Sequence, residues 1–335
     1  MGGLSLKNLP EDKKTRRYHK DEYFNLSEEL LPKIKEIFNT DISLVMSYHN
    51  KETFGDMDIL ILNKGYDNIP KLIQELEPSE INGNGNVYSF DYKNLQIDLI
   101  MTDPENWEAS NIFFQWGDLG NLMGKLFNSY GNMDNFILKY GFDGMKIKMI
   151  YNGYSKYLSL TKDNKKAFEF LGLDFERHKE GFNDQFEMFD YIIGSKYFSY
   201  DIFQWENLTS VNKNRNKRRP VFIEFLKYIE SHKNIITYDE KNEIYLENLS
   251  RFFNINIKEE YQMLVDKVEY DKSISDKFGG KYIMESFNLE SGKELGKMML
   301  NFKMEIESNN GDYNDFINNH SREELKSMFK RLNNL

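Results

Sequence analysis

The chain has 335 residues, no cysteine and a formal net charge of -10, so disulfides and thiolate metal sites are excluded. Hydrophobic residues make up 40% and aromatic residues 15%, which is enough for a sizeable core and argues against wholesale disorder. No apolar run approaches the roughly 20 residues of a membrane helix. The acidic balance argues against a surface coated in nucleic acid but allows a local basic groove. We expect a soluble, cytoplasmic protein of two or three domains that does not bind a membrane.

Residues 1–20 are polar and rich in lysine and arginine, which predicts a flexible basic arm. Apolar residues at helical spacing then predict a helix over 26–38. Two strands are expected next, at 41–48 and 57–62, with a turn between them. A short helix over 68–77 is followed by the segment 81–102, which we interpret as two strands joined by an Asn-Gly-Asn-Gly loop.

The pattern changes after Trp107. Helical spacing over 117–131 is followed by strand character over 143–160, and the chain is mostly helical by period from residue 165. The fold class predicted is α+β, with a small mixed sheet and flanking helices followed by a mostly helical C-terminal domain. In chain order, the expected segments are the arm 1–20, a sheet domain 21–105, a further unit 106–160 and a helical domain 161–335.

The sequence Gly-Asp-Met-Asp at residues 55–58 places two acids one residue apart at the start of an apolar strand. Side chains at i and i+2 of a strand point to the same side, so Asp56 and Asp58 should project together and repel each other. Asp98 lies within a second apolar strand, where a carboxylate is costly unless it is paired or binds a metal. The alternative is that Asp56 caps a turn and Asp58 faces solvent.

Carboxylate oxygens from Asp56, Asp58 and Asp98 suit Mg²⁺ or Mn²⁺, which keep some waters and take substrate phosphates as further ligands. Two such ions about 4 Å apart would hold the attacking and leaving oxygens of a phosphoryl transfer. Gly55, directly before the pair, allows a tight turn and close approach of a ligand to the backbone.

The segments KETFGDMDILIL (51–62) and LQIDLIM (95–101) together resemble the palm of the nucleotidyltransferase superfamily, closest to the family X DNA polymerases related to polymerase beta. The resemblance covers roughly residues 20–150. It implies that Asp56, Asp58 and Asp98 are catalytic and bind two Mg²⁺ or Mn²⁺ ions, with Asp98 helping to activate a 3′-hydroxyl. It also implies a thumb-like unit over 106–160.

The resemblance extends to the segment FFQWGDLGNLMGKLF (113–127), which is similar to the part of the family's nucleotide pocket that follows the third aspartate. Phe114, Gly117, Asp118 and Asn121 are the positions that it assigns to nucleotide binding, together with Gly55. The chain departs from the family at Val45 and Met46, where the family has Gly-Ser, and at Tyr48 and His49, where it has arginines. Ser47 and Lys51 could take over the phosphate contacts.

A basic segment, NKNRNKRRP (212–220), stands out in this acidic chain. Five side chains in it are candidates for nucleic-acid binding, namely Lys213, Arg215, Lys217, Arg218 and Arg219. Contacts from such side chains to phosphates would release counterions and make binding sensitive to salt. A solvated surface loop is the alternative interpretation.

These patterns lead to one main hypothesis. The chain would be a metal-dependent nucleotidyltransferase that moves a nucleoside monophosphate from an NTP or dNTP to a hydroxyl, with a nucleic-acid 3′ end as acceptor and DNA favoured over RNA. The alternative, motivated by Val45 and Met46, is a catalytically degenerate palm that binds nucleic acid or protein. A toxin- or antitoxin-type enzyme that modifies a tRNA or a protein is a third possibility. The acceptor, the template requirement and the oligomeric state stay open.

Overall fold

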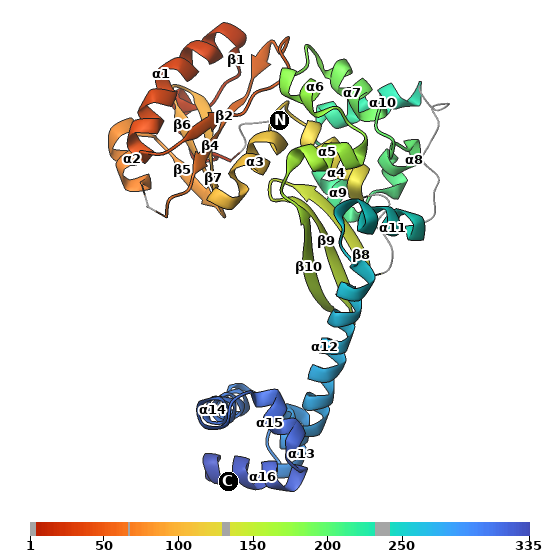
Figure 1. Cartoon of the computed structure of the whole chain (residues 1–335). Coiled ribbons are helices and arrows are strands. Elements are labelled where there is room, and N and C mark those ends of the chain that lie inside the picture. The colour runs from red at the N-terminus through yellow and green to blue at the C-terminus, as the bar shows by residue number, and fades with distance from the viewer. Residues whose placement is uncertain (1–4, 66–67, 129–134, 232–241) are drawn as a thin grey trace. The chain divides into compact units, whose positions relative to one another are not determined.

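The computed structural model describes residues 5–65, 68–128, 135–231 and 242–335. The chain forms two compact units (Figure 1). The first runs to Lys148 and resumes from Tyr157 to Ile255, and the second combines 149–156 with 256–335. The strand-rich N-terminal part and the helical C-terminal part confirm the α+β class.

A five-stranded mixed sheet forms the first part of unit 1. Its strands lie in the order β2-β4-β7-β6-β5. Their bounds are β2 Ile42–Leu44, β4 Asp56–Leu62, β5 Ile81–Asn84, β6 Val87–Tyr92 and β7 Leu95–Thr102. The central pair β4 and β7 is parallel, and the other neighbours are antiparallel.

Two helices, α1 (Lys20–Phe38) and α2 (Ile69–Leu76), cover one face of this sheet (Figure 1). The apolar stripe of α1, including Leu30 and Ile34, packs in one core with Met57 and Ile59 of β4. Because side chains alternate along a strand, this packing directs Asp56 and Asp58 to the opposite face. The amphipathic period of α1 therefore determines which face of the sheet remains available for a site.

The segment 81–102 forms three strands, so the expectation of two was wrong. The turns lie at Gly85 (φ 62°) and at Lys93–Asn94, whose φ angles of 49° and 62° are left-handed. Gly83 and Asn84, which we assigned to a loop, instead belong to the edge strand β5. An edge strand tolerates such residues because it pairs on one side only.

The N-terminal segment, residues 5–19, lies along the sheet. Ser5 N–H donates to Gln96 Oε1 at 3.0 Å, and Asn94 Nδ2 donates to two backbone carbonyls of the segment. Its last residues form β1 (Tyr18–His19), antiparallel to β3 (Thr53–Phe54). Residues 5–19 therefore make specific contacts, whereas their polar composition suggests a flexible arm. Backbone groups make most of these contacts, and composition carries no information on backbone pairing.

The rest of unit 1 comprises short helices and most of a sheet of order β10-β9-β8, whose residues 149–156 belong to unit 2. The elements are η2 Pro104–Asn106, α3 Trp107–Phe113, α4 Leu119–Asn128, β8 Phe136–Gly141, β9 Gly144–Tyr151, β10 Tyr154–Thr161, α5 Asn164–Leu171, α6 Phe175–Glu180, α7 Gln185–Ile193, α8 Tyr200–Phe203, η4 Trp205–Asn207, α9 Ser210–Asn216, α10 Pro220–Glu230 and α11 Asn242–Phe253. Residues 129–131 of the expected helix lie outside the described part of the chain.

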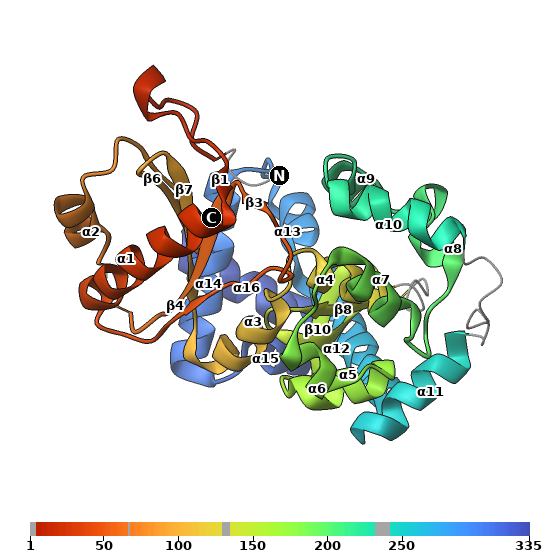
Figure 2. The same ribbon diagram turned by 90° about the horizontal axis from the view of Figure 1, so that it is seen from above.

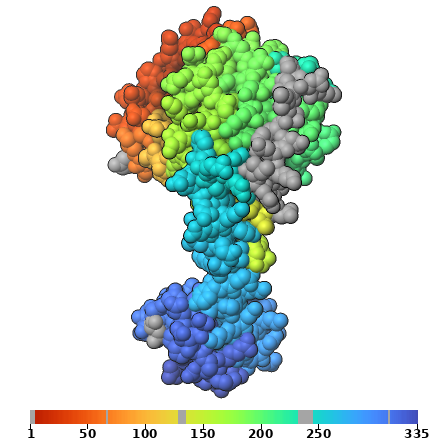
Figure 3. Space-filling model, turned by 45° about the vertical axis from the view of Figure 1, so that its right-hand side comes forward, coloured from red at the N-terminus to blue at the C-terminus, as the bar shows by residue number. Residues whose placement is uncertain are grey.

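The helices from residue 161 to Ile255 pack on the first half of the chain and belong to unit 1. The sequence pattern instead suggests one separate helical domain over 161–335. Aromatic side chains make these contacts: Phe182 meets Trp116 with ring centroids 6.1 Å apart, and Phe168 meets Tyr140 at 6.4 Å. In the space-filling view the green helices lie directly against the red and orange part of the chain (Figure 3).

Unit 2 is helical apart from residues 149–156. Its helices are α12 Ile257–Phe278, α13 Gly280–Phe287, α14 Lys293–Asn310, α15 Tyr313–Asn319 and α16 Arg322–Asn333. They share a core that includes Phe278, Phe302 and Phe329. Within the described residues of the chain, no helix is both long and apolar enough to cross a membrane.

Candidate functional site

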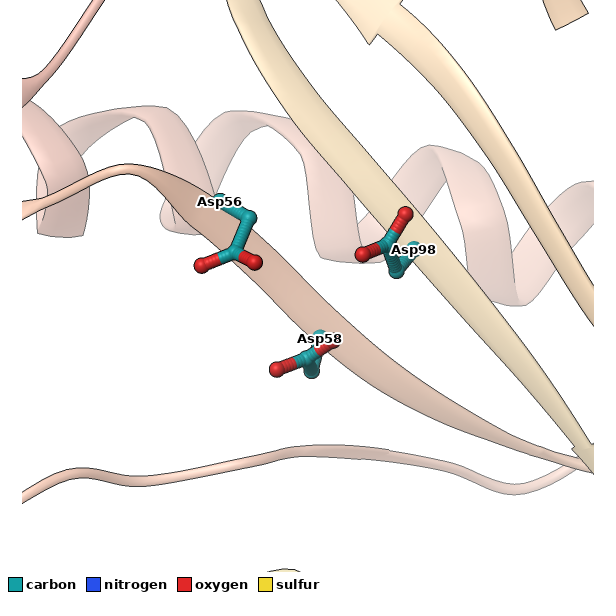
Figure 4. Close-up of side chains that lie close together, drawn as sticks. All are labelled: Asp56, Asp58 and Asp98. Carbon is teal, nitrogen blue, oxygen red and sulfur yellow. The ribbon is translucent and has the colours of Figure 1, made fainter. Parts of the chain in front are cut away.

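Three carboxylates meet on the sheet face that α1 leaves uncovered. Asp56 and Asp58 project from β4, and Asp98 projects from the neighbouring strand β7 (Figure 4). The parallel register places Asp58 directly opposite Asp98. One carboxylate oxygen from each residue lies within 4.8 Å of the others. We call these three residues the aspartate cluster.

The aspartate cluster has the chemistry of a divalent-cation site. Burial raises the pKa of Asp58 well above the ordinary carboxyl range, and the charges of Asp56 and Asp98 raise it further. Burial also raises the pKa of Asp98, although hydrogen bonds from Ser89 and Gln96 oppose this. Three partly buried carboxylates are hard oxygen ligands, and a bound cation would offset their repulsion. The cluster could therefore hold a metal ion.

Gln96 fixes the orientation of Asp98. Its Nε2 donates to both carboxylate oxygens at 2.9 Å, and the Gln96 side chain is buried. The N–H of Ser5 occupies the other end of the amide by donating to Oε1. The N-terminal segment therefore supports the aspartate cluster through one intermediate side chain, a relation that the sequence pattern does not reveal.

A cavity of about 800 Å³ opens beside the aspartate cluster, within unit 1. Asp56 and Asp58 line it, and so does every residue that we assigned to nucleotide binding, namely Ser47, Lys51, Gly55, Gly117, Asp118 and Asn121. Phe114 lines it as well. In Figure 2, α9 and α10 lie across from β1 and β3. Residues at the junction of α9 and α10 form the wall of the cavity that lies far from Asp56 and Asp58.

Three of the five basic candidates, Arg215, Arg218 and Arg219, lie in this far wall. The basic segment is not a loop throughout, because α9 runs to Asn216 and α10 begins at Pro220. We call these three residues the arginine wall. The other two lysines bond elsewhere: Lys213 Nζ donates to Glu206 O and Lys217 Nζ to Asn214 Oδ1, both at 3.2 Å.

The loop around Ser47 is held on both sides. Met46 N–H donates to Gln115 Oε1 at 2.7 Å, and His49 N–H donates to Phe182 O at 2.8 Å. Between them, Ser47 and Tyr48 both line the cavity, and their N–H groups have no acceptor within the described part of the chain. Two adjacent free N–H donors at a cavity are suited to an anion.

A tight turn presents the start of α4 to the cavity. Trp116 and Gly117 both have left-handed backbones, with φ of 66° and 68°. A Cβ at Gly117 would make only an ordinary contact, 3.6 Å from Ser47 Oγ, so glycine suits this position because of the left-handed backbone. Asp118 pairs with Arg219, and Asn121 Nδ2 donates to the buried Asn216 at 3.1 Å. These contacts join the start of α4 to α9 and to the arginine wall.

Sequence reasoning missed Arg17 as a cavity residue, along with Gln185, Met188 and Glu224. Arg17 Nε donates to Thr53 Oγ1 at 3.0 Å and its Nη2 donates to Thr53 O at 2.8 Å, just before Gly55 on the chain. The pair Arg16-Arg17 was visible as basic residues, but only the β1–β3 pairing brings Arg17 to the cavity.

No protein-family model matches this chain, and no curated protein matches it well enough to indicate a relationship. Interpretation of the site therefore rests on its geometry and on the residues themselves.

Proposed function

We propose that the chain is a metal-dependent nucleotidyltransferase that transfers a nucleoside monophosphate from an NTP or dNTP to the 3′-hydroxyl of a nucleic acid. The observation that carries this proposal is the aspartate cluster at one wall of a cavity whose other wall is the arginine wall. A triphosphate needs both a site for divalent cations and positive groups for its remaining charge.

The proposed roles of the residues follow from their positions. Asp56, Asp58 and Asp98 would hold Mg²⁺ or Mn²⁺, which when bound supplies electrostatic stabilisation of the charge that develops during phosphoryl transfer. Lys51, the arginine wall and the free N–H groups of Ser47 and Tyr48 would bind phosphate oxygens. These phosphate-binding groups would replace the Gly-Ser and arginine contacts that the family X DNA polymerases use.

Burial lowers the pKa of Lys51, while the charge of Asp56 raises it. A bound phosphate would stabilise the ammonium form of Lys51 in the same way as Asp56 does. The aromatic side chains Phe113 and Phe114 also line the cavity and offer apolar surface for a base or sugar.

The test combines thermal unfolding with a transfer assay. We expect Mn²⁺ together with a nucleoside triphosphate to raise the melting temperature, and a labelled primer to be extended. Asp56→Asn/Asp58→Asn should lose both effects. Asp41→Asn/Asp103→Asn, which removes two exposed carboxylates beside strands of the same sheet, should keep both.

The outcomes separate the hypotheses. Stabilisation by the metal without stabilisation by any triphosphate, and without extension, would contradict the proposal and support a degenerate palm. Extension of tRNA in place of the primer would leave the chemistry intact and change the acceptor.

A further inference from the structure

The solvent-facing side of the sheet β8–β9–β10 carries a cluster of lysines around one tyrosine. Tyr157 is 49% exposed. The ammonium groups of Lys139, Lys146 and Lys148 lie 5.3, 5.0 and 5.9 Å from the centroid of its ring. We call these four residues the lysine face, and all of them belong to unit 1.

Strand alternation explains why the lysine face is separate from the core. Lys146 and Lys148 alternate with Met145 and Ile147, which are fully buried on the other side of β9. Lys139 likewise follows the buried Leu138 on β8. The lysines therefore do not contribute to the core, and their clustering needs another explanation.

The charge on this face is only partly balanced. From Phe136 to Thr161 the chain contains four lysines and one acidic residue, in a protein whose formal charge is -10. That acid, Asp143, pairs with Lys146. Within the described residues, Lys139 and Lys148 have no carboxylate at ion-pair distance. The hydrogen bond from Lys139 and the nearby ammonium charges lower the pKa of Tyr157, which indicates a positive local potential.

A chain of side-chain contacts connects the lysine face to the cavity. Phe114, which lines the cavity, stacks on Phe142 with ring centroids 6.2 Å apart and planes 14° apart. Phe142 is 43% exposed and precedes Asp143, the partner of Lys146. Exposed aromatic rings and lysines thus follow one another from the cavity to Tyr157.

We propose that the lysine face binds single-stranded nucleic acid, with a base stacked on Tyr157 and phosphates contacted by Lys139 and Lys148. Alternating aromatic and cationic groups suit a single strand because each base exposes a π-face and each phosphate a negative charge. The inference rests on the proposed function only in that the bound strand would lead its 3′ end past Phe142 and Phe114 to the aspartate cluster.

The experiment measures binding of the full chain to labelled single-stranded DNA, single-stranded RNA and the matching duplex by fluorescence anisotropy. Lys139→Gln/Lys148→Gln should weaken single-strand binding at low salt and reduce the slope of log K against log salt by about 1.4, or about 0.7 per lost phosphate contact. Tyr157→Ser should weaken binding roughly tenfold, whereas Tyr157→Phe should bind like the wild type because the ring is kept.

The control is Lys35→Gln/Lys71→Gln, which removes two exposed lysines from α1 and α2 on the covered face of the five-stranded sheet. It should bind like the wild type. The proposal is overturned if the Lys139/Lys148 variant keeps its affinity and salt slope, or if the control loses as much. Equal binding of duplex, with no effect of Tyr157→Ser, would also overturn it.

A catalytic variant separates this inference from the proposed function. Asp56→Asn/Asp58→Asn should abolish transfer, and in that background Lys139→Gln/Lys148→Gln should still weaken single-strand binding, because the lysine face itself is unchanged. If wild-type protein binds the strand through the lysine face yet transfers no nucleotide, the inference stands and the proposed function fails. If the protein transfers nucleotide and the lysine face contributes nothing to strand binding, the proposed function stands and this inference fails.

Discussion

Asp58 lies opposite Asp98 of the neighbouring strand and two positions from Asp56 on β4. Each of these neighbouring carboxylates makes ionisation of Asp58 more costly. We expect Asp58→Asn to raise the free energy of unfolding by about 1–2 kcal/mol in the presence of a chelator, because folding then no longer buries an ionisable group whose charge burial and the two neighbouring carboxylates disfavour. In Mn²⁺ the order should reverse, since the wild type then gains binding energy. Urea unfolding of both proteins under both conditions measures this, and a variant that is less stable in chelator would contradict it.

His178 provides a second prediction at the scale of a residue. Its ring is buried and packs 4.8 Å from the ring of Phe168, and burial lowers its pKa to about 4. The unfolded ring has a pKa near 6.5, so between these values the unfolded chain binds a proton that the folded chain does not. The free energy of unfolding should therefore fall as the pH falls from about 6.5 to about 4, by up to roughly 3 kcal/mol from this group.

The measurement for His178 is denaturant unfolding at several pH values between 7 and 4.5. His178→Leu should show a flatter profile in this window because it has no proton to gain in the unfolded state. Other groups titrate in both proteins, so only the difference between the two profiles is informative. Parallel profiles would show that His178 does not cause the loss.

At the scale of an element, the N-terminal segment is the part whose loss should affect the site most selectively. Removal of residues 2–9 takes away the Ser5 N–H that fixes Gln96, which in turn orients Asp98. Loss of a supporting residue behind a metal ligand typically weakens metal affinity about 10–100-fold. We expect a weaker Mn²⁺-induced rise in melting temperature, and a similar loss in Gln96→Ala.

Glu80→Ala serves as the control for this deletion. Asn8 also binds the half-buried Glu80, through its backbone and side chain, so Glu80→Ala tests the docking of the segment without touching Gln96. Unchanged Mn²⁺ affinity in the deletion and in Gln96→Ala would contradict the supporting role.

How far the sequence predicts the structure depends on how local each feature is. The spacing of Asp56 and Asp58, and the apolar residues around Asp98, were sufficient to predict strands and a shared cluster, since a strand has a two-residue period. The positions of Arg17 and the arginine wall at the cavity were not predictable, because they depend on β1–β3 pairing and on helices packed far along the chain. The extra strand in 81–102 was missed because glycine and asparagine in an edge strand look like a loop.

At the scale of the whole molecule, the two units have separate cores, and the cavity belongs to unit 1 alone. A chain ending at Ile255 should therefore keep the Mn²⁺- and triphosphate-dependent stabilisation. It would lose the partners of the β9–β10 tip, where Tyr151 bonds Glu269 and Lys156 pairs with Glu260. We expect a small loss of stability at the tip and an unchanged ligand response; absence of that response in a folded fragment would contradict the assignment of the cavity to unit 1.

The docking of residues 5–19 also has a consequence for the order of events during synthesis. Ser5 emerges from the ribosome 91 residues before its partner Gln96. Until Gln96 has emerged, Ser5 lacks this contact, and closure of so long a loop is slow compared with local helix formation. The two ends of this stretch must meet before Asp98 is held in place, so the aspartate cluster should be completed late, after the strands that carry it have already paired.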